Sequence, residues 1–196
     1  NGLYATSAGT GGITIIEVMR TPSDTKLSLE LTGKQGSVMK ESMRCAKTVA
    51  WNLLPYDIKK KINKEWDEVG QFGLHIHCPE AATPKDGPSA GLAITIAILS
   101  RLCNIKIKNT IGITGEIDLN GKSHQIGGLE SKLDGAKRAG ITKVLIPEDN
   151  RHDYEVLIEK LNEEDREKYN DNFEIVFVKT IKEVIKQSLV SNELKY

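Results

Sequence analysis

The spacing of apolar residues along the chain follows two periods, and each period predicts its own kind of element. Alternating apolar and polar positions predict a first strand over residues 13–18 and a second over residues 27–31, which Gly33 closes. A short turn at residues 21–24 joins them, so we expect an antiparallel pair near the start of the chain. From residue 37 to 54 the apolar residues recur every three or four positions, which predicts an amphipathic helix.

The rest of the chain continues this mixture of strands and helices. Residues 72–78 predict a strand with Leu74 and Ile76 on one face and His75 and His77 on the other. Turn residues are predicted at 9–12 and 120–121, helices at 89–103, 128–139, from about 153, and at 181–189, and strands at 110–117, 143–146 and 173–178. No internal repeat divides the chain. The pattern therefore predicts a single domain of the α/β or α+β class.

Composition and charge exclude several classes of protein. The 196 residues contain 27 basic and 27 acidic side chains, which gives no electrostatic case for binding nucleic acid. The basic run at residues 59–64 is interleaved with acidic neighbours and predicts a solvated helix face. The longest apolar stretch, residues 92–99, is too short to span a bilayer, and no secretory signal is visible at the first residues. We therefore expect neither a nucleic-acid nor a membrane partner.

The three cysteines indicate the compartment. Cys45, Cys78 and Cys103 are far apart, odd in number and form no Cys-x-x-Cys motif. They are typical of small apolar residues in a reducing, intracellular compartment.

Ser89 follows a turn that can lead directly into a helix. The preceding Asp86, Gly87 and Pro88 suit a turn, a cap and a first helical turn, and this places Ser89 at or near the helix N-terminus. Unpaired backbone N–H groups there are available to a developing oxyanion. On local sequence alone, an ordinary serine of a helix cap explains the same residues.

Lys132 lies 43 positions later, on what should be an apolar face. In a helix it shares that face with Leu129, Leu133 and Ala136. Burial disfavours the charged amine and can lower its pKa from ~10.4 towards ~7–8. A neutral amine beside a hydroxyl is sufficient for nucleophilic acyl transfer without histidine. The alternative is a lysine that extends from the edge of the stripe to water.

Two other patterns resemble a metal site and a phosphate-binding loop, but neither has the residues that such a site needs. His75 and His77 could form a metal pair, yet no third ligand stands at a convincing spacing, which favours structural histidines. Gly121-Lys122-Ser123 invites comparison with a phosphate-binding P-loop, but the glycine required five positions before Gly121 is replaced by Glu116. We therefore expect no metal and no nucleotide site in this chain.

Several sequence blocks, in a fixed order, resemble the proteolytic domain of Lon, an ATP-dependent protease with a Ser–Lys dyad. The resemblance covers most of the chain. The blocks are His75-Ile76-His77-Cys78-Pro79-Glu80, Ala82-Thr83-Pro84-Lys85-Asp86-Gly87-Pro88-Ser89-Ala90-Gly91, Thr114-Gly115-Glu116-Ile117, Ile126-Gly127-Gly128-Leu129 with Lys132, and Arg138-Ala139-Gly140-Ile141 leading to Val144-Leu145-Ile146-Pro147. The resemblance implies a single α+β domain over residues 1–196, with mixed sheets, flanking helices and a ribosomal-protein-like fold.

The resemblance also implies a role for individual residues. Ser89 would be the nucleophile and Lys132 the general base that later returns the proton to the leaving amine. Thr114 would place a hydroxyl near the lysine amine. Asp86 would shape the loop before the serine, and His77 would lie near the site without being required by the dyad.

Further expectations concern the longer protein. The upstream AAA+ ATPase and N-terminal domains of Lon are absent from this chain, so ATP and Mg²⁺ are expected at the absent ATPase domain and no cofactor in this chain. Unfolded or regulatory proteins would be the substrates, a homohexameric ring the assembly, and the cytoplasm or the mitochondrial matrix the location. The rival interpretations are a catalytically idle Lon-like scaffold domain, and a small-molecule kinase on a similar fold, which the missing phosphate-binding loop disfavours.

Overall fold

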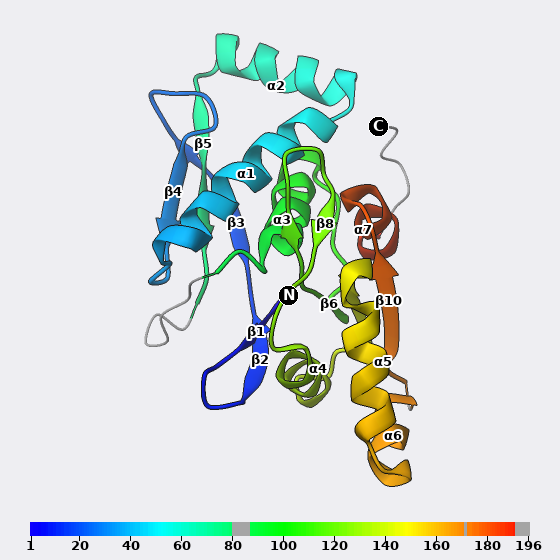
Figure 1. The fold of residues 1–196 in the computed structure, drawn as a ribbon. Coiled ribbons are helices and arrows are strands. Elements are labelled where there is room, and N and C mark those ends of the chain that lie inside the picture. Colours follow the sequence, from blue (N-terminus) through cyan, green and yellow to red (C-terminus); the bar gives the residue numbers. More distant parts are fainter. Residues whose placement is uncertain (80–86, 171, 191–196) are drawn as a thin grey trace.

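Two β-sheets on either side of a central helix organise the chain in the computed structural model, which describes residues 1–79, 87–170 and 172–190 (Figure 1). The larger sheet has the strand order β10-β9-β6-β1-β2 and the smaller one the order β3-β5-β4. A third, two-stranded ribbon is formed by β7 (Glu116–Ile117) and β8 (Ser123–His124). Mixed sheets with flanking helices confirm the α+β class.

The five-stranded sheet combines an antiparallel hairpin with a parallel region. Strands β1 and β2 are antiparallel, whereas the pairs β1–β6, β6–β9 and β9–β10 are parallel. The central parallel strands are apolar because both faces are covered, as Val144, Leu145 and Ile146 of β9 illustrate. The bounds are β1 (Gly2–Ala5), β2 (Gly11–Thr14), β6 (Ile111–Ile113), β9 (Lys143–Pro147) and β10 (Glu174–Val178).

The three-stranded sheet corrects the predicted start of the chain. Its strands are β3 (Glu17–Pro22), β4 (Leu29–Thr32) and the central β5 (Phe72–His77), which is antiparallel to β3 and parallel to β4. The predicted strand over residues 13–18 is therefore two strands in two different sheets, and the predicted pairing between the first two strands is wrong. The antiparallel pair of the N-terminal region is instead the β1–β2 hairpin, which the sequence analysis did not predict.

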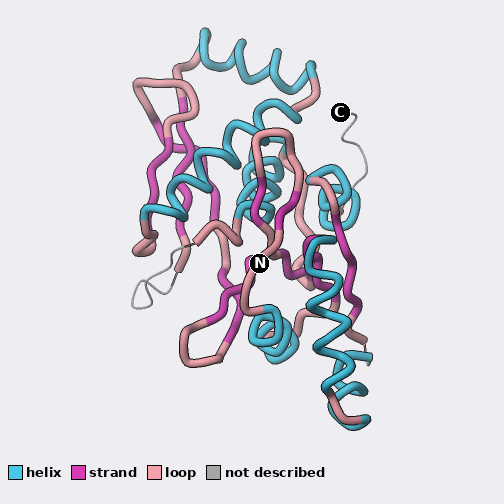
Figure 2. Tube along the Cα trace, in the orientation of Figure 1, coloured by secondary structure: helices cyan, strands magenta, loops and turns pink. Residues whose placement is uncertain are grey.

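Helix α3 (Gly91–Cys103) occupies the middle of the molecule. Every residue from 91 to 99 is buried, so the helix is apolar on all sides rather than amphipathic. In the shared view of Figure 1 and Figure 2, the three-stranded sheet and β10 lie on opposite sides of α3. The remaining helices are α1 (Ser37–Leu53), α2 (Tyr56–Glu68), α4 (Leu129–Arg138), the 3₁₀ turn η1 (Glu148–Asn150), α5 (Arg151–Lys160), α6 (Glu163–Asn170) and α7 (Ile181–Ser188).

Buried side chains form two separate clusters. The larger one joins α1, α2, α3 and α7 to the three-stranded sheet and to β6, β9 and β10 of the five-stranded sheet, and it includes Met43, Leu74 and Leu145. The smaller one joins α4 and α5 to the five-stranded sheet and includes Leu133 and Val144. The turn that carries Ser89 leads into the first cluster, whereas Lys132 lies on a helix of the second. The fold thus draws the two candidate residues from different cores.

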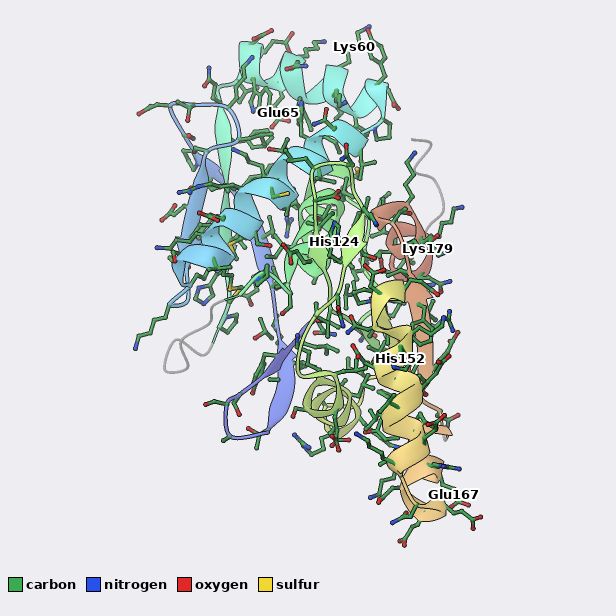
Figure 3. All side chains as sticks on the ribbon, viewed as in Figure 1. Lys60, Glu65, His124, His152, Glu167 and Lys179 are labelled. Atoms are coloured by element: carbon green, nitrogen blue, oxygen red, sulfur yellow. The ribbon has the colours of Figure 1, made fainter. Side chains whose placement is uncertain are left out.

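The basic run lies on α2, as the sequence analysis predicted. Ile62 and Trp66 are the buried residues of this helix, Lys60 projects outward (Figure 3), and Glu65 pairs with Arg20 of β3 at 3.0 Å. The lysines therefore form a solvated face. Within the described ranges, none of the helices has the length and apolar content needed to cross a membrane.

Candidate active site

Ser89 lies in the turn immediately before α3 and is half-buried. It does not cap the helix, because the N-cap position is Ala90 and no side chain forms a cap hydrogen bond there. The turn is closed by a hydrogen bond from the Gly91 N–H to the Pro88 carbonyl, at 3.1 Å. The hydroxyl thus stands at the positive end of a buried helix, an environment that favours negative charge.

The main chain of Ser89 is held from the neighbouring strand. Its carbonyl accepts a hydrogen bond from the Gly115 N–H at 2.7 Å and a longer one from the Thr114 hydroxyl at 3.4 Å. The Gly115 carbonyl in turn accepts from the Leu92 N–H at 3.1 Å. This reciprocal pair fixes the start of α3 beside the link between β6 and β7.

Two glycines make that close approach possible. A methyl group at Gly91 would lie 2.8 Å from the Ile117 side chain and 3.1 Å from the Ser42 hydroxyl. Gly115 has a φ of +159°, and a methyl group there would lie 2.3 Å from a Leu92 methyl carbon. The strand predicted over residues 110–117 is accordingly broken at Gly115 into β6 and β7. The sequence signal was present in the glycines, but spacing alone does not reveal which neighbour they accommodate.

Lys132 is buried on α4, and its side chain does not reach solvent as a surface lysine would. It is 4% exposed and shares the buried face with Leu129, Leu133 and Ala136, as predicted. Burial lowers the pKa of its amine from 10.5 to about 8. A substantial fraction of the amine is therefore neutral near physiological pH and able to accept a proton.

Helix α4 is pressed against the β1–β2 hairpin. A methyl group at Gly135 would lie 2.3 Å from the main chain of Gly11. A methyl group at Gly11 would lie 2.0 Å from the main chain of Ser131. The Ser131 hydroxyl donates to the Gly9 carbonyl at 3.1 Å, and Arg138 donates to the Gly11 carbonyl at 2.8 Å. Residues 9–12 were predicted to be a turn. Instead, Gly11 and Gly12 belong to β2 and provide the surface on which the lysine helix rests.

Thr114 is fully buried at the end of β6, where its N–H donates to the Leu145 carbonyl at 3.1 Å. Its hydroxyl is bonded to the Ser89 carbonyl, so the structure brings Thr114 and Ser89 together. Within the described ranges, no hydrogen bond joins the Lys132 amine to Ser89 or Thr114. The predicted contact between the Thr114 hydroxyl and the lysine amine therefore stays a prediction.

His77 and its neighbour His75 share one hydroxyl on the adjacent strand. The Thr32 hydroxyl lies 2.6 Å from His77 Nδ1 and 2.8 Å from His75 Nε2. Residues 1–79, 87–170 and 172–190 contain no group of three or more histidine, cysteine or acidic side chains suited to a metal ion. Asp86, the fifth candidate site residue, lies outside the described residues.

The Gly121-Lys122-Ser123 segment leads from the predicted turn of the β7–β8 ribbon into β8, which begins at Ser123. Gly121 has a φ of +79°, and its N–H donates to the Asp118 carbonyl at 3.0 Å. A hairpin turn of this kind does not precede a helix N-terminus, which is where P-loops bind phosphate.

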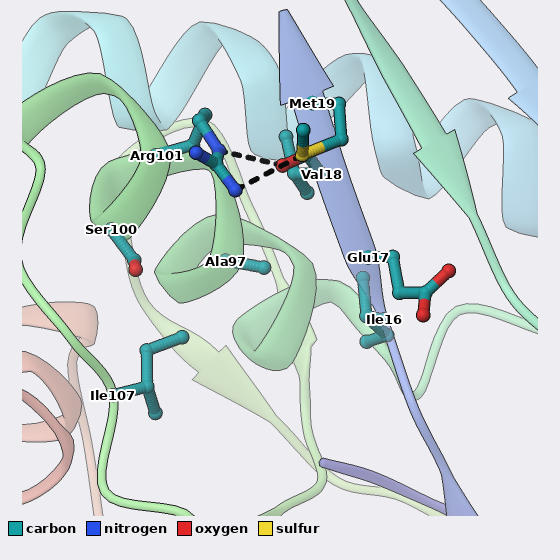
Figure 4. Close-up of a pocket in the computed structure, with 8 residues that line it drawn as sticks. All are labelled: Ile16, Glu17, Val18, Met19, Ala97, Ser100, Arg101 and Ile107. Atoms are coloured by element: carbon teal, nitrogen blue, oxygen red, sulfur yellow. Dashed lines mark hydrogen bonds between the residues drawn. The ribbon is translucent and has the colours of Figure 1, made fainter.

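A pocket of about 440 Å³ lies between β3 and the C-terminal half of α3, away from Ser89 at the helix start (Figure 4). On its rim, Arg101 donates to the Val18 carbonyl at 2.7 Å and contacts the Met19 sulfur at 3.1 Å. Arg101 thereby occupies a carbonyl on the outer edge of β3, a common means of protecting an edge strand.

Comparison with known proteins identifies the family. The profile of the Lon protease (S16) C-terminal proteolytic domain matches residues 1–191. The chain is 44% identical over 190 residues to a Lon protease homolog of Acanthamoeba polyphaga mimivirus, covering 94% of this chain and 18% of the relative. It is 42% identical over 184 residues to the Lon protease of Fusobacterium nucleatum, covering 91% of this chain and 23% of the relative. A mitochondrial Lon protease homolog of Phaeodactylum tricornutum is 41% identical over 150 residues, covering 76% of this chain and 16% of the relative.

The chain thus spans about a fifth of the length of these relatives. The profile match extends from the β1–β2 hairpin to the last described helix, so both cores fall within it. The chain belongs to the family of Lon-type serine protease domains.

Proposed function

We propose that this domain hydrolyses peptide bonds through an acyl-enzyme on Ser89, with Lys132 as the general base. The observation that carries the proposal is the burial of Lys132, which lowers the pKa of its amine to about 8 in a domain of a protease family. A charged lysine could not take a proton from a hydroxyl. A largely desolvated amine with a pKa near 8 can do so at neutral pH.

The proposed reaction proceeds in two halves. Lys132 removes the proton from the Ser89 hydroxyl as its oxygen attacks the scissile carbonyl, and a tetrahedral oxyanion forms. Backbone N–H groups just before α3 stabilise that charge, since those of Gly91 and Leu92 already bond to the Pro88 and Gly115 carbonyls. The lysine then gives the proton to the leaving amine, and the C–N bond breaks. Water, deprotonated by Lys132, attacks the ester, and the proton returns to Ser89 as the acid product leaves.

Three other residues have supporting roles in the proposal. The Thr114 hydroxyl, already beside the Ser89 carbonyl, would orient the lysine amine during the transfer. Asp86 would shape the loop before the serine. His77 would lie near the site, where Thr32 fixes its ring.

The function of the longer protein is also a proposal. By analogy with its relatives, an upstream AAA+ ATPase that binds ATP and Mg²⁺ would unfold substrate proteins and deliver them to this domain. The assembly would be a homohexameric ring, located in the cytoplasm or the mitochondrial matrix. The chain described here would need no cofactor of its own.

The test is the pH dependence of fluorogenic-peptide hydrolysis by the chain, compared with Ser89→Ala and Lys132→Met. We expect a rate that rises with pH through an apparent pKa near 8, and losses of at least ~10³-fold in both variants. Substantial hydrolysis by purified Ser89→Ala would contradict the assignment of the nucleophile. Lys137→Met, which replaces a neighbouring lysine on the same helix, serves as the matched control and should retain the wild-type rate.

A catalytically idle scaffold domain remains the second candidate. The observation that favours it is the lack of a hydrogen bond from Lys132 to Ser89 among the described residues. Covalent labelling by a peptidyl boronate separates the two: labelling that Ser89→Ala abolishes supports the protease, and no labelling of the assembled protein supports the scaffold.

A further inference from the structure

Asn150 is a fully buried amide whose side chain serves a distant part of the chain. It stands at the N-cap position of α5, where an asparagine commonly accepts a hydrogen bond from its own helix. Among the residues that the structure describes, however, no side chain caps α5. Asn150 Oδ1 instead accepts from the Ile126 N–H at 3.0 Å, and Nδ2 donates to the Ile126 carbonyl at 2.9 Å.

The orientation of this amide is fixed by a carboxylate. Nδ2 of Asn150 donates its second hydrogen to Asp153, at 2.8 Å, and Asp153 also accepts from the Gln125 side chain at 2.9 Å. A flipped amide would place its oxygen against both the carboxylate and the Ile126 carbonyl. Each polar atom of Asn150 therefore has a partner, and the side chain holds residue 126 much as a neighbouring strand would.

The segment held in this way leads directly to the candidate base. After Ile126, the chain passes through Gly127 to Gly128, whose φ of +67° begins α4. A methyl group at Gly128 would lie 2.7 Å from the Ala5 methyl carbon, so the main chain is close to β1 here. The Gly128 carbonyl accepts from the Lys132 N–H at 3.0 Å. Movement of this segment therefore moves the helical turn that carries Lys132.

Leu129 packs into the smaller cluster, but the other side-chain hydrogen bonds of α4 among the described residues act at residue 131 or beyond it. Ser131 bonds to Gly9, Arg138 bonds to Gly11, and Asp134 accepts from the Tyr169 hydroxyl at 2.5 Å. These contacts fix the helix sideways and at its far end, and none of them holds residues 125–128.

We propose that Asn150 is a positioning residue, which fixes the start of α4 and so sets how deeply the Lys132 side chain is buried. This inference rests on the proposed role of Lys132 for its catalytic meaning. Its structural consequence can be measured without peptide hydrolysis. Because burial is the cause of the lowered pKa, the titration of Lys132 reports the depth at which the amine is held.

The test is an NMR titration of the chain labelled with ¹³C at the lysine ε-carbon, with the Lys132 signal assigned through Lys132→Met. Asn150→Ala removes all three hydrogen bonds. We expect the Lys132 titration to move up by about one pH unit in this variant as water reaches the amine. Ser100→Ala is the matched control: it removes a side-chain bond of 2.6 Å to the Ile105 carbonyl, but in the other core. It should leave the titration unchanged.

A second variant guards against misfolding and against a direct charge effect. Asp153→Ala leaves Asn150 in place but frees its amide to turn, so we expect a smaller upward shift. Removal of a negative charge by itself would move the lysine pKa down, so a rise isolates the positional effect. A Lys132 titration equal to that of wild type in both folded variants would overturn the proposal.

Activity provides a separate readout. If the chain hydrolyses peptide, the rising limb of the kcat profile should move up in pH by the same amount as the NMR titration in each variant. A shifted titration in a chain without hydrolysis would uphold the positioning role and refute the proposed function. A uniform loss of kcat with no movement of the limb would show that Asn150 is merely structural.

Discussion

The burial of Lys132 favours proton transfer and opposes folding. In the unfolded chain the amine has its ordinary pKa, whereas in the fold burial lowers that pKa from 10.5 to about 8. Between these values the unfolded state binds a proton that the folded state has lost, so the free energy of unfolding rises with pH across this window. Below pH 8 the folded protein holds a charged amine in an apolar core and is least stable with respect to this residue.

Lys132→Met should therefore stabilise the protein at pH 7, by about 2–3 kcal/mol on the linkage relation. The advantage should shrink as the pH rises towards 10.5 and disappear above it, where the lysine is neutral in both the folded and the unfolded state. Urea denaturation at pH 7 and pH 9.5 measures this. Lys137→Met on the same helix should change stability by no more than about 0.5 kcal/mol. A clear destabilisation of Lys132→Met at pH 7 would contradict the burial argument.

Thr114 offers a test of a single buried hydroxyl. Thr114→Val keeps the shape of the side chain but removes the donor to the Ser89 carbonyl, a long bond of 3.4 Å. We expect the free energy of unfolding to change by no more than about 1 kcal/mol, while peptide hydrolysis falls at least ~10-fold because the proposed partner of the amine is lost. Thr114→Ser, which retains a hydroxyl, should restore most of the rate. Equal rates in wild type and Thr114→Val would exclude a role for this hydroxyl in the reaction.

At the scale of elements, local periodicity predicted the long helices and the buried strands well. The helical spacing from residue 37 matches α1, and the apolar run before Pro147 matches β9. Periodicity failed where the chain passes from one sheet to another. Between Thr14 and Glu17 the apolar alternation continues, although the sheet changes. Alternation reports which face of a strand is buried and contains no information about its partner strand.

The candidate site shows the same division between local and distant information. The burial of Lys132 was predicted from its own helix, because its neighbours at helical spacing are apolar. Gly135 of that helix and Gly11 of β2 are more than a hundred positions apart, and only their contact explains why neither has a side chain. Asn150 escaped prediction for the same reason, since its partner Ile126 lies on a separate segment.

Gly135→Ala should be strongly destabilising because its new methyl group would lie 2.3 Å from the main chain of the β1–β2 hairpin. Alanine favours helices by about 1 kcal/mol over glycine, but overpacking against rigid backbone costs about 3 kcal/mol or more. The net loss should appear in urea denaturation. Gly127→Ala, just before the same helix, has nothing within 4 Å of the new methyl group, so its change should stay within about 1 kcal/mol. Equal stability of the two variants would refute the close contact.

At the scale of the whole molecule, the proposed dyad joins two cores. Ser89 precedes a helix of the larger cluster and Lys132 lies on a helix of the smaller one. The β6–β7 link, through Thr114 and Gly115, connects the serine turn to the five-stranded sheet. The Gly121-Lys122-Ser123 segment leads from a hairpin turn into β8.

The chain alone should therefore cleave short unstructured peptides at a rate that ATP and Mg²⁺ do not change. On the proposed function, degradation of a folded protein should appear only when the proposed ATPase region is joined to it. Rates with and without ATP–Mg²⁺, for a fluorogenic peptide and for a stably folded protein, measure both statements. A response of the isolated chain to ATP would show a nucleotide site that the sequence does not predict. It would refute the proposal that ATP acts only through a separate ATPase region.

The contact between α4 and the β1–β2 hairpin has a consequence for the newly made chain. The bond from Ser131 to Gly9 joins residues 122 positions apart, so the surroundings of Lys132 are complete only after most of the domain has been synthesised and has collapsed. Until then the lysine is hydrated, protonated at neutral pH and unable to activate a hydroxyl. On the proposed mechanism, an incomplete or unfolded chain contains both reactive side chains but cannot hydrolyse other proteins. Folding itself would therefore activate the protease, without cleavage of a propeptide.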